Sequence, residues 1–166
     1  MVIDADAINI IAKRPQMLKQ LPAKSILTPH LGELQRLVGK WESDFDMLEK
    51  TAQLAKEHDI IIVIKGAHTI TVYDFNLYIN TTGNPGLATA GTGDVLTGVI
   101  TGLIAQHYHP MQAAILGVYF HGLAADIAVN QYSIEGLAAG DVIEFLGRAV
   151  MDLFAKPEET KQQASS

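Results

Sequence analysis

The sequence has no cysteine, and it is poor in positive charge and in long apolar runs. The missing cysteine excludes disulfides, thiol catalysis and cysteine-ligated zinc, and it favours a reducing, cytoplasmic compartment. Lys and Arg number 12 against 18 Asp and Glu, a net charge of −6, so a broad basic surface for nucleic-acid phosphates or anionic lipid is not expected. The longest apolar span, residues 95–105, falls short of the ~20 residues that a membrane helix needs. We therefore expect neither a nucleic acid nor a membrane as partner.

The chain is rich in apolar side chains. They make up 48% of its 166 residues, enough for one buried core and too much for bulk disorder. Residues 60–64 (IIIVI) form an unbroken β-branched run, which is typical of a strand buried on both faces of a parallel sheet. The pattern also predicts strands at 2–3, 25–28, 69–73 and 77–80, the last two as a hairpin, and helices at 4–12, 31–38, 94–106, 111–131 and 139–154, with another opening at Ser43.

The alternation of strands and helices predicts the α/β class and one compact domain over residues 1–155. Residues 156–166 are polar and are expected to form a frayed tail. The chain opens directly on a strand of the buried type, with no room for the unit that should precede it. We therefore expect an N-terminally truncated piece of a longer domain.

Glycine-rich backbone precedes the helix predicted at 94–106. Gly91-Thr92-Gly93 lets the chain approach a ligand closely, and the helix start adds unpaired N–H groups and the positive end of the helix dipole. These features predict an anion site, with Asp94 directed at whatever carries the anion. Asp94 can take a hydroxyl proton late in a phosphoryl transfer, where positioning and charge stabilisation supply most of the catalysis. The alternative is that Asp94 only caps the helix and the glycines only turn the chain.

Two further segments follow predicted strands, at the edge where open α/β sheets bind ligands. Lys65-Gly66 comes directly after the strand at 60–64, and its ammonium group can meet a phosphate. In the segment 28–33 (TPHLGE), His30 can form a hydrogen bond to a ligand and Glu33 can hold a magnesium-bound water. Each segment has a plainer interpretation, as a solvated lysine and as a capping box with Glu at the third helical position.

Other candidates are weak or missing. The sequence contains neither a P-loop nor a G-x-G-x-x-G fingerprint. His107, His109 and His121 share no metal-ligand spacing and are interpreted as structural residues. Asp44 and Asp46 are interpreted as first-turn residues of a helix. Asp4 and Asp6 follow a strand and either line the cleft or do not, with Asp6 as a candidate helix cap.

Taken together, four segments carry a resemblance to a known family. They stand in the order DADAIN at 4–9, TPHLGE at 28–33, KGAHT at 65–69 and NPGLATAGTGD at 84–94. The chain closely resembles the ADP-dependent NAD(P)H-hydrate dehydratases of the ribokinase-like superfamily. The resemblance implies a three-layer αβα fold around a mostly parallel central sheet. It also implies a metabolite-repair lyase that uses ADP to dehydrate the S-form of hydrated NADH or NADPH (NADHX, NADPHX), giving NAD(P)H, AMP and phosphate.

The same resemblance assigns roles to individual residues. Asp94 would be the catalytic base, and Glu33 would hold Mg²⁺ indirectly, through water. The nucleotide, ADP or alternatively ATP, would be bound by Lys65, Gly66, Ala67, His68, Thr69, Asn84, Gly91, Thr92 and Gly93. The hydrated dinucleotide would be bound by Asp6, Asn9, His30 and Asp94. A homo-oligomer, specifically a tetramer, and an epimerase domain in a longer parent chain are further implications.

The sequence departs from the family in two places. Leu31 stands where proline is common, and the glycine-rich segment that opens the family's domain is not part of this sequence. Two alternatives therefore stay open: a small-molecule kinase of the same superfamily, and a fragment that binds nucleotide without turnover. A kinase would leave the phosphate on its product, and His30 argues against it because those kinases more often have Asn there.

Overall fold

A computed structural model describes residues 1–154 of the chain. The tail expected at 156–166 lies outside the described residues, and the domain limit at residue 155 stays a prediction. The elements are β1 (Val2–Ile3), α1 (Ala5–Lys13), the 3₁₀ helix η1 (Pro15–Gln20), β2 (Ile26–Leu27), α2 (Leu31–Val38), α3 (Asp44–His58), β3 (Ile61–Ile64), β4 (Ile70–Tyr73), β5 (Asn76–Ile79), the 3₁₀ helix η2 (Pro85–Ala88), α4 (Thr92–Ala105), α5 (Pro110–Tyr132) and α6 (Ala139–Phe154).

The strands form one mixed sheet in the order β1-β2-β3-β4-β5. β1, β2 and β3 run parallel, with Val2 opposite Ile26 and Ile26 opposite Ile61. β4 pairs antiparallel with β3, and β5 pairs antiparallel with β4, placing Thr71 opposite Tyr78. The α/β class is confirmed, and the hairpin expected from the sequence adds an antiparallel edge to the parallel part of the sheet.

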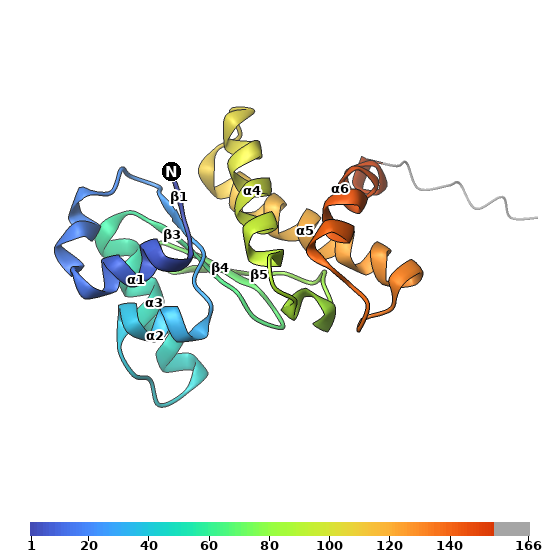
Figure 1. The fold of residues 1–166 in the computed structure, drawn as a ribbon. Coiled ribbons are helices and arrows are strands. Elements are labelled where there is room, and N and C mark those ends of the chain that lie inside the picture. Colours follow the sequence, from blue (N-terminus) through green and yellow to red (C-terminus); the bar gives the residue numbers. More distant parts are fainter. Residues whose placement is uncertain (155–166) are drawn as a thin grey trace, which may run out of the picture.

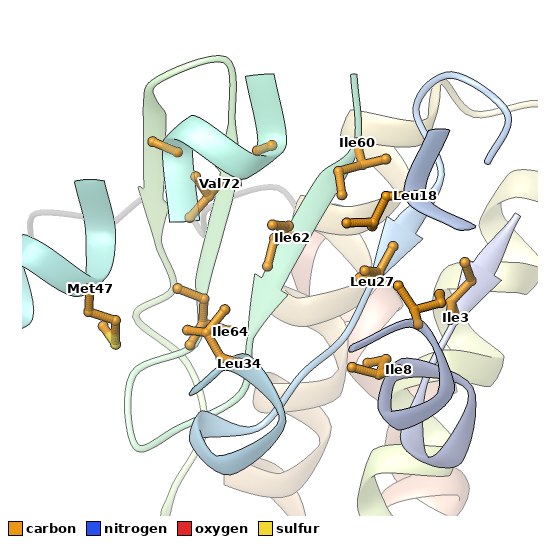
Figure 2. Close-up of a cluster of buried hydrophobic side chains, with 13 residues drawn as sticks. Ile3, Ile8, Leu18, Leu27, Leu34, Met47, Ile60, Ile62, Ile64 and Val72 are labelled. Carbon is orange, nitrogen blue, oxygen red and sulfur yellow. The ribbon is translucent and has the colours of Figure 1, made fainter. Parts of the chain in front are cut away.

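Helices cover both faces of this sheet, so the fold has helix, sheet and helix layers (Figure 1). Figure 2 shows the face beneath α1, α2 and α3. Here Leu27 of β2 and Ile62 and Ile64 of β3 pack with Ile8 of α1 and Leu34 of α2. These five side chains are at most 3% exposed, so this face holds the larger part of the apolar core.

The opposite face packs against α4 and α5. Ile61 and Val63 of β3 and Ile26 of β2 meet Leu96 and Ile100 of α4 there. Since neighbouring residues of a strand point to opposite faces, β3 is buried on both sides. This double burial is the physical reason for the unbroken apolar run at 60–64. α6 lies beyond α5 and packs against it (Figure 1).

α5 is the central helix of the second helical layer. By length and composition it is the one helix in residues 1–154 able to cross a membrane, but 56% of its most apolar stretch is buried inside the protein. A Cβ on Gly117 would lie 2.6 Å from the Ile100 side chain, so the bare backbone at Gly117 lets α4 approach closely. The pattern is typical of a core helix. The sequence-based statement that 95–105 is the longest apolar span was wrong, because α5 is longer.

Local sequence signals account for most element ends. Ser43 caps α3 by accepting a hydrogen bond from the Asp46 N–H at 3.2 Å, and Gly39 ends α2 with a φ of 84°. The two 3₁₀ helices were not predicted. η2 lies in the small-residue segment before α4, where the Asn84 side chain accepts a hydrogen bond from Gly86 N–H and so starts the turn.

We expect Ile62→Ala to lower the free energy of unfolding by about 2–5 kcal/mol, because it leaves a cavity in a core where Ile62 is fully buried. Ile79→Ala is the matched control, since Ile79 is 65% exposed on β5. It should cost about 1 kcal/mol or less. Urea denaturation followed by circular dichroism measures both values. Equal losses at the two positions would contradict the proposed core.

Candidate functional site

Two of the sequence segments meet where the parallel strands end. The N–H of Lys65 donates to the carbonyl of Pro29 at 2.8 Å, and His30 and Lys65 form an isolated parallel bridge. This bridge extends the β2–β3 pairing beyond the strands, so the segments 28–33 and 65–69 lie side by side. Carboxyl ends of parallel strands are the usual ligand edge of an α/β sheet.

His30 and Glu33 form a reciprocal cap at the start of α2. The His30 Nδ1 accepts hydrogen bonds from the N–H groups of Gly32 at 3.0 Å and Glu33 at 3.3 Å, and the Glu33 Oε2 accepts one from His30 N–H at 2.9 Å. Because Nδ1 accepts, the proton of the neutral ring lies on Nε2, which is 3.5 Å from the Glu33 Oε1. The capping-box interpretation is therefore correct for this segment. The His30 side chain is still 56% exposed beside Lys65, whereas the Glu33 carboxylate is buried and directed at His30.

Lys65 is held against the start of α4 by a carboxylate from the N-terminal segment. Its Nζ donates to the Asp4 Oδ1 at 2.7 Å, and the Thr97 hydroxyl donates to the Asp4 Oδ2 at 3.1 Å. A Cβ on Gly93 would lie 3.4 Å from the Lys65 Nζ, so glycine leaves room for the ammonium group at the helix start. Burial raises the pKa of Asp4, but the hydrogen bonds from Lys65 and from Ala5 N–H, with the Lys65 charge, outweigh it and leave this pKa below its ordinary value.

The first turn of α4 presents unpaired N–H groups. Gly91 occupies the N-cap in the left-handed region, with a φ of 88°, and gives no side-chain cap. The Thr92 hydroxyl turns away and donates to the carbonyls of Leu87 and Thr89 at 2.7 and 2.8 Å. Among residues 1–154, no partner occurs for the N–H of Gly91, Gly93 or Asp94. The positive end of the helix dipole and the Lys65 ammonium thus act on the same small region.

Asp94 lies exposed in this first turn. Gly91 takes the N-cap position three residues earlier, and no side chain caps the helix there. Asp94 therefore makes no capping hydrogen bond to α4 within the described residues. Asp94 belongs to the same helical turn as the unpaired N–H groups of Gly91 and Gly93.

The loop before η2 is fixed to α5. The Asp126 carboxylate accepts hydrogen bonds from Gly83 N–H at 2.7 Å and from the Asn84 side chain at 2.9 Å. The Thr82 hydroxyl donates to the Tyr119 carbonyl at 2.9 Å, and a Cβ on Gly122 would clash with Thr82. A small polar cavity of about 30 Å³ lies between this loop, α5 and the segment that follows β3, and it is lined in part by Gly66, Ala67, Thr69, Gly83, Asn84 and His121.

The structure thus brings together several of the residues predicted from the sequence. Lys65 faces Gly93, His30 adjoins Lys65, and Asn84 shares the small cavity with Gly66, Ala67 and Thr69. Asp6 and Asn9 lie on α1, where Asp6 is exposed and the Asn9 side chain accepts a hydrogen bond from Arg36 at 2.9 Å. His68 is exposed in the turn after Lys65.

Three supporting residues were not identified from the sequence as parts of the site. Thr97 anchors Asp4, Asp126 holds the loop at 83–84, and His121 bonds to the first turn of α4. Thr97 and Asp126 lie outside the four segments on which the resemblance rests. The signal available for His121 and Asp126 was polarity, because both are polar residues in an otherwise apolar helix that the structure places under the glycine-rich turn.

Comparison with solved structures defines the class of fold. A ribokinase-like superfamily protein from Enterococcus faecalis has a TM-score of 0.73 and 30% identity, over 94% of this chain and 53% of that one. The Bacillus subtilis ADP/ATP-dependent NAD(P)H-hydrate dehydratase, co-crystallised with ATP and Mg²⁺, has a TM-score of 0.73 and 34% identity, over 91% and 54%. The ribokinase-like fold expected from the sequence is confirmed.

The sequence comparison then defines the family. The model of the NAD(P)H-hydrate dehydratase family matches residues 1–148, so the chain belongs to this family. It is 44% identical over 155 residues to the bifunctional NAD(P)H-hydrate repair enzyme Nnr of Moorella thermoacetica, an alignment that covers 92% of this chain and 29% of the relative. The chain therefore spans less than a third of that bifunctional protein, and about half of the solved relatives.

We expect Asp4→Asn to lower the free energy of unfolding at pH 7 by about 1–3 kcal/mol, because it removes the charged acceptor from Lys65 and Thr97. Since the pKa of Asp4 is lowered on folding, its stabilising contribution is present above the ordinary value near 3.8 and is lost as the pH falls below it. The variant should accordingly lose less stability than the parent chain between about pH 5 and pH 3.

Asp74→Asn is the control for this pair. Asp74 forms a 3.3 Å ion pair with Lys56, but both side chains are more than half exposed, so the change should be within about 0.5 kcal/mol. Urea titrations across this pH range measure both variants. An Asp4→Asn variant with the stability and pH dependence of the parent would contradict the role of the Asp4–Lys65 pair.

Proposed function

We propose that the chain carries the catalytic centre of an ADP-dependent (S)-NAD(P)H-hydrate dehydratase. The observation that carries this proposal is the convergence of the Lys65 ammonium and the unpaired N–H groups of the α4 start beside Asp94. Backbone donors and a fixed cation stabilise a transferring phosphoryl group, and a carboxylate at their edge is placed to receive a proton. Membership of the dehydratase family gives the substrate class.

In the proposed reaction ADP transfers its terminal phosphoryl group to the hydroxyl of the hydrated nicotinamide ring, and AMP leaves. Asp94 accepts the hydroxyl proton as the new oxygen–phosphorus bond forms. The ring nitrogen then drives the loss of phosphate: the carbon–oxygen bond breaks to leave a cationic iminium ring, and loss of a proton from the neighbouring ring carbon to water restores NAD(P)H. The N–H groups of Gly91 and Gly93 and the Lys65 ammonium hold the phosphoryl group during transfer.

The remaining predicted residues fit around this centre. Gly66, Ala67, Thr69 and Asn84 surround the cavity of about 30 Å³, which has room for about one water molecule. They are proposed to contact the rest of the nucleotide at the surface around this cavity, with His68 and Thr92. His30 presents an exposed ring next to Lys65 and is proposed to contact the hydrated dinucleotide. Asp6 and Asn9 on α1 are proposed to bind the same substrate.

Magnesium is proposed to arrive with the nucleotide. No cluster of three or more His, Asp or Glu side chains suited to a metal ion occurs among residues 1–154. This fits Mg²⁺, which keeps several waters and is held largely by substrate phosphates, where it offsets their negative charge. Glu33 is the proposed indirect ligand, although its carboxylate caps α2 through His30. ATP is the alternative donor, since the Bacillus subtilis relative is ADP/ATP-dependent.

The assembly and location follow as further proposals. We propose a cytoplasmic homo-oligomer, a tetramer, in keeping with apolar side chains exposed on the β4–β5 hairpin, among them Phe75, Leu77 and Ile79. An epimerase domain in a longer parent chain is proposed from the bifunctional relative, of which this chain covers 29%.

The proposal is tested by the absorbance at 340 nm of the chain with hydrated NADH, Mg²⁺ and either ADP or ATP. The reduced-nicotinamide band should grow, with AMP and free phosphate as the other products when ADP is used. Asp94→Asn should slow this growth by about 10²–10⁴-fold, the range for a lost proton acceptor. Asp44→Asn is the matched control, because Asp44 is an exposed acid in the first turn of α3 and lies outside the site.

Three results would contradict the proposal. A stable phosphorylated product with no gain at 340 nm would indicate a kinase. Nucleotide binding with a flat trace would indicate a binding fragment. Full activity in Asp94→Asn would remove Asp94 from the catalytic role.

A further inference from the structure

His121 of α5 lies buried beneath the start of α4. The residue is 7% exposed, and its Nε2 is 2.9 Å from the Thr92 carbonyl oxygen. A carbonyl oxygen only accepts hydrogen bonds, so Nε2 carries the ring proton and donates it to Thr92. The same ring lines the small cavity shared with Gly66, Ala67 and Asn84.

The bonded carbonyl belongs to the peptide unit that contains the N–H of Gly93. A trans peptide is planar, and its C=O and N–H point in opposite directions. A donor that holds the Thr92 oxygen on the α5 side therefore directs the Gly93 N–H away from α5. Gly93 is also the residue next to the Lys65 ammonium. Donation to a peptide oxygen polarises the unit and strengthens its own N–H as a donor.

Burial keeps this donor uncharged. Desolvation lowers the pKa of His121 to about 4, although the bond to Thr92 acts in the opposite direction. At neutral pH the ring is therefore a fixed, neutral N–H donor, and it adds no charge to the anion site. Gly122, the next residue, packs bare backbone against Thr82, which brings the loop at 82–84 to the same part of α5.

We propose that His121 is a positioning residue for phosphoryl binding, which fixes the Thr92–Gly93 peptide so that the Gly93 N–H faces the terminal phosphate of the nucleotide. This inference rests on the proposed function and adds to it a residue with no direct contact to the phosphate. α5 then supports both sides of the nucleotide site. His121 fixes the phosphate side, and Asp126 fixes the loop at 83–84.

The test compares ADP with adenosine, because only ADP reports on the phosphate side. Calorimetric titrations at pH 7 should show His121→Leu binding ADP about tenfold more weakly than the parent chain and adenosine within about twofold. His121→Gln retains a side-chain N–H and should restore ADP affinity to within about threefold of the parent. Ile62→Ala, in the core on the opposite face of the sheet, controls for lost stability and should leave the ADP-to-adenosine affinity ratio unchanged.

Equal weakening of ADP and adenosine in His121→Leu, or no weakening of either, overturns the inference. So does a His121→Gln variant that binds ADP as poorly as His121→Leu. If His121→Leu does not fold, the His121→Gln titration and the ring itself decide: nitrogen-detected NMR of the parent chain should show a neutral, Nε2-protonated imidazole at pH 6. A charged ring or an Nδ1-protonated ring there overturns the inference.

Failure of the proposed function gives a different result. A parent chain that binds ADP but does not dehydrate the hydrate contradicts the dehydratase alone, and the ADP-to-adenosine comparison still decides the role of His121. A parent chain that does not bind ADP overturns both.

Discussion

The parallel pairing of β2 with β3 is the constraint on which the site depends. The pairing continues past the strands to the bridge between His30 and Lys65, so two segments more than thirty residues apart end at one edge. A slip of β3 by one residue would draw Asp59 or Lys65 into the buried run at 60–64, so the burial of this run on both faces constrains its register. The apolar packing shown in Figure 2 therefore also fixes the position of the Lys65 backbone, from which the side chain extends to the site.

The site provides local hydrogen-bond donors in a chain whose net charge is negative. The net charge is −6, yet the start of α4 combines a helix dipole, unpaired N–H groups and the Lys65 ammonium. Asp4 holds this ammonium group in place. Its two carboxylate oxygens accept hydrogen bonds from Lys65 and Thr97, so they do not occupy the N–H groups at the start of α4. The proposed phosphate site therefore rests on fixed backbone dipoles and one fixed ammonium group, since the sequence has no P-loop.

Much of the fold follows from the sequence, because periodicity and turn residues report directly on burial and helix ends. The apolar run at 60–64 predicted the central strand β3. Gly39 predicted the end of α2, and Ser43 predicted the start of α3. The candidate site was predicted where it depends on local backbone, as at Gly91 to Asp94. Long-range partners were not predictable, since nothing in the residues near Asp4 or Thr92 indicates Thr97 or His121. The capping role of Glu33 was visible locally. The bounds of α5 were predicted to within one residue, whereas its standing as the longest apolar helix was missed because Gln112, His121 and Asp126 interrupt the apolar run.

Lys65 and the α4 start are proposed to form one phosphate site with the residues that follow β3. Amide NMR of the nitrogen-labelled chain during titration with ADP tests it most directly. We expect the largest shifts at Gly91, Gly93 and Asp94 and at residues 65–69. AMP, which lacks the terminal phosphate, should give smaller shifts at 91–94. ADP-dependent shifts concentrated elsewhere, such as on α2 and α3, with residues 91–94 unchanged, would contradict it.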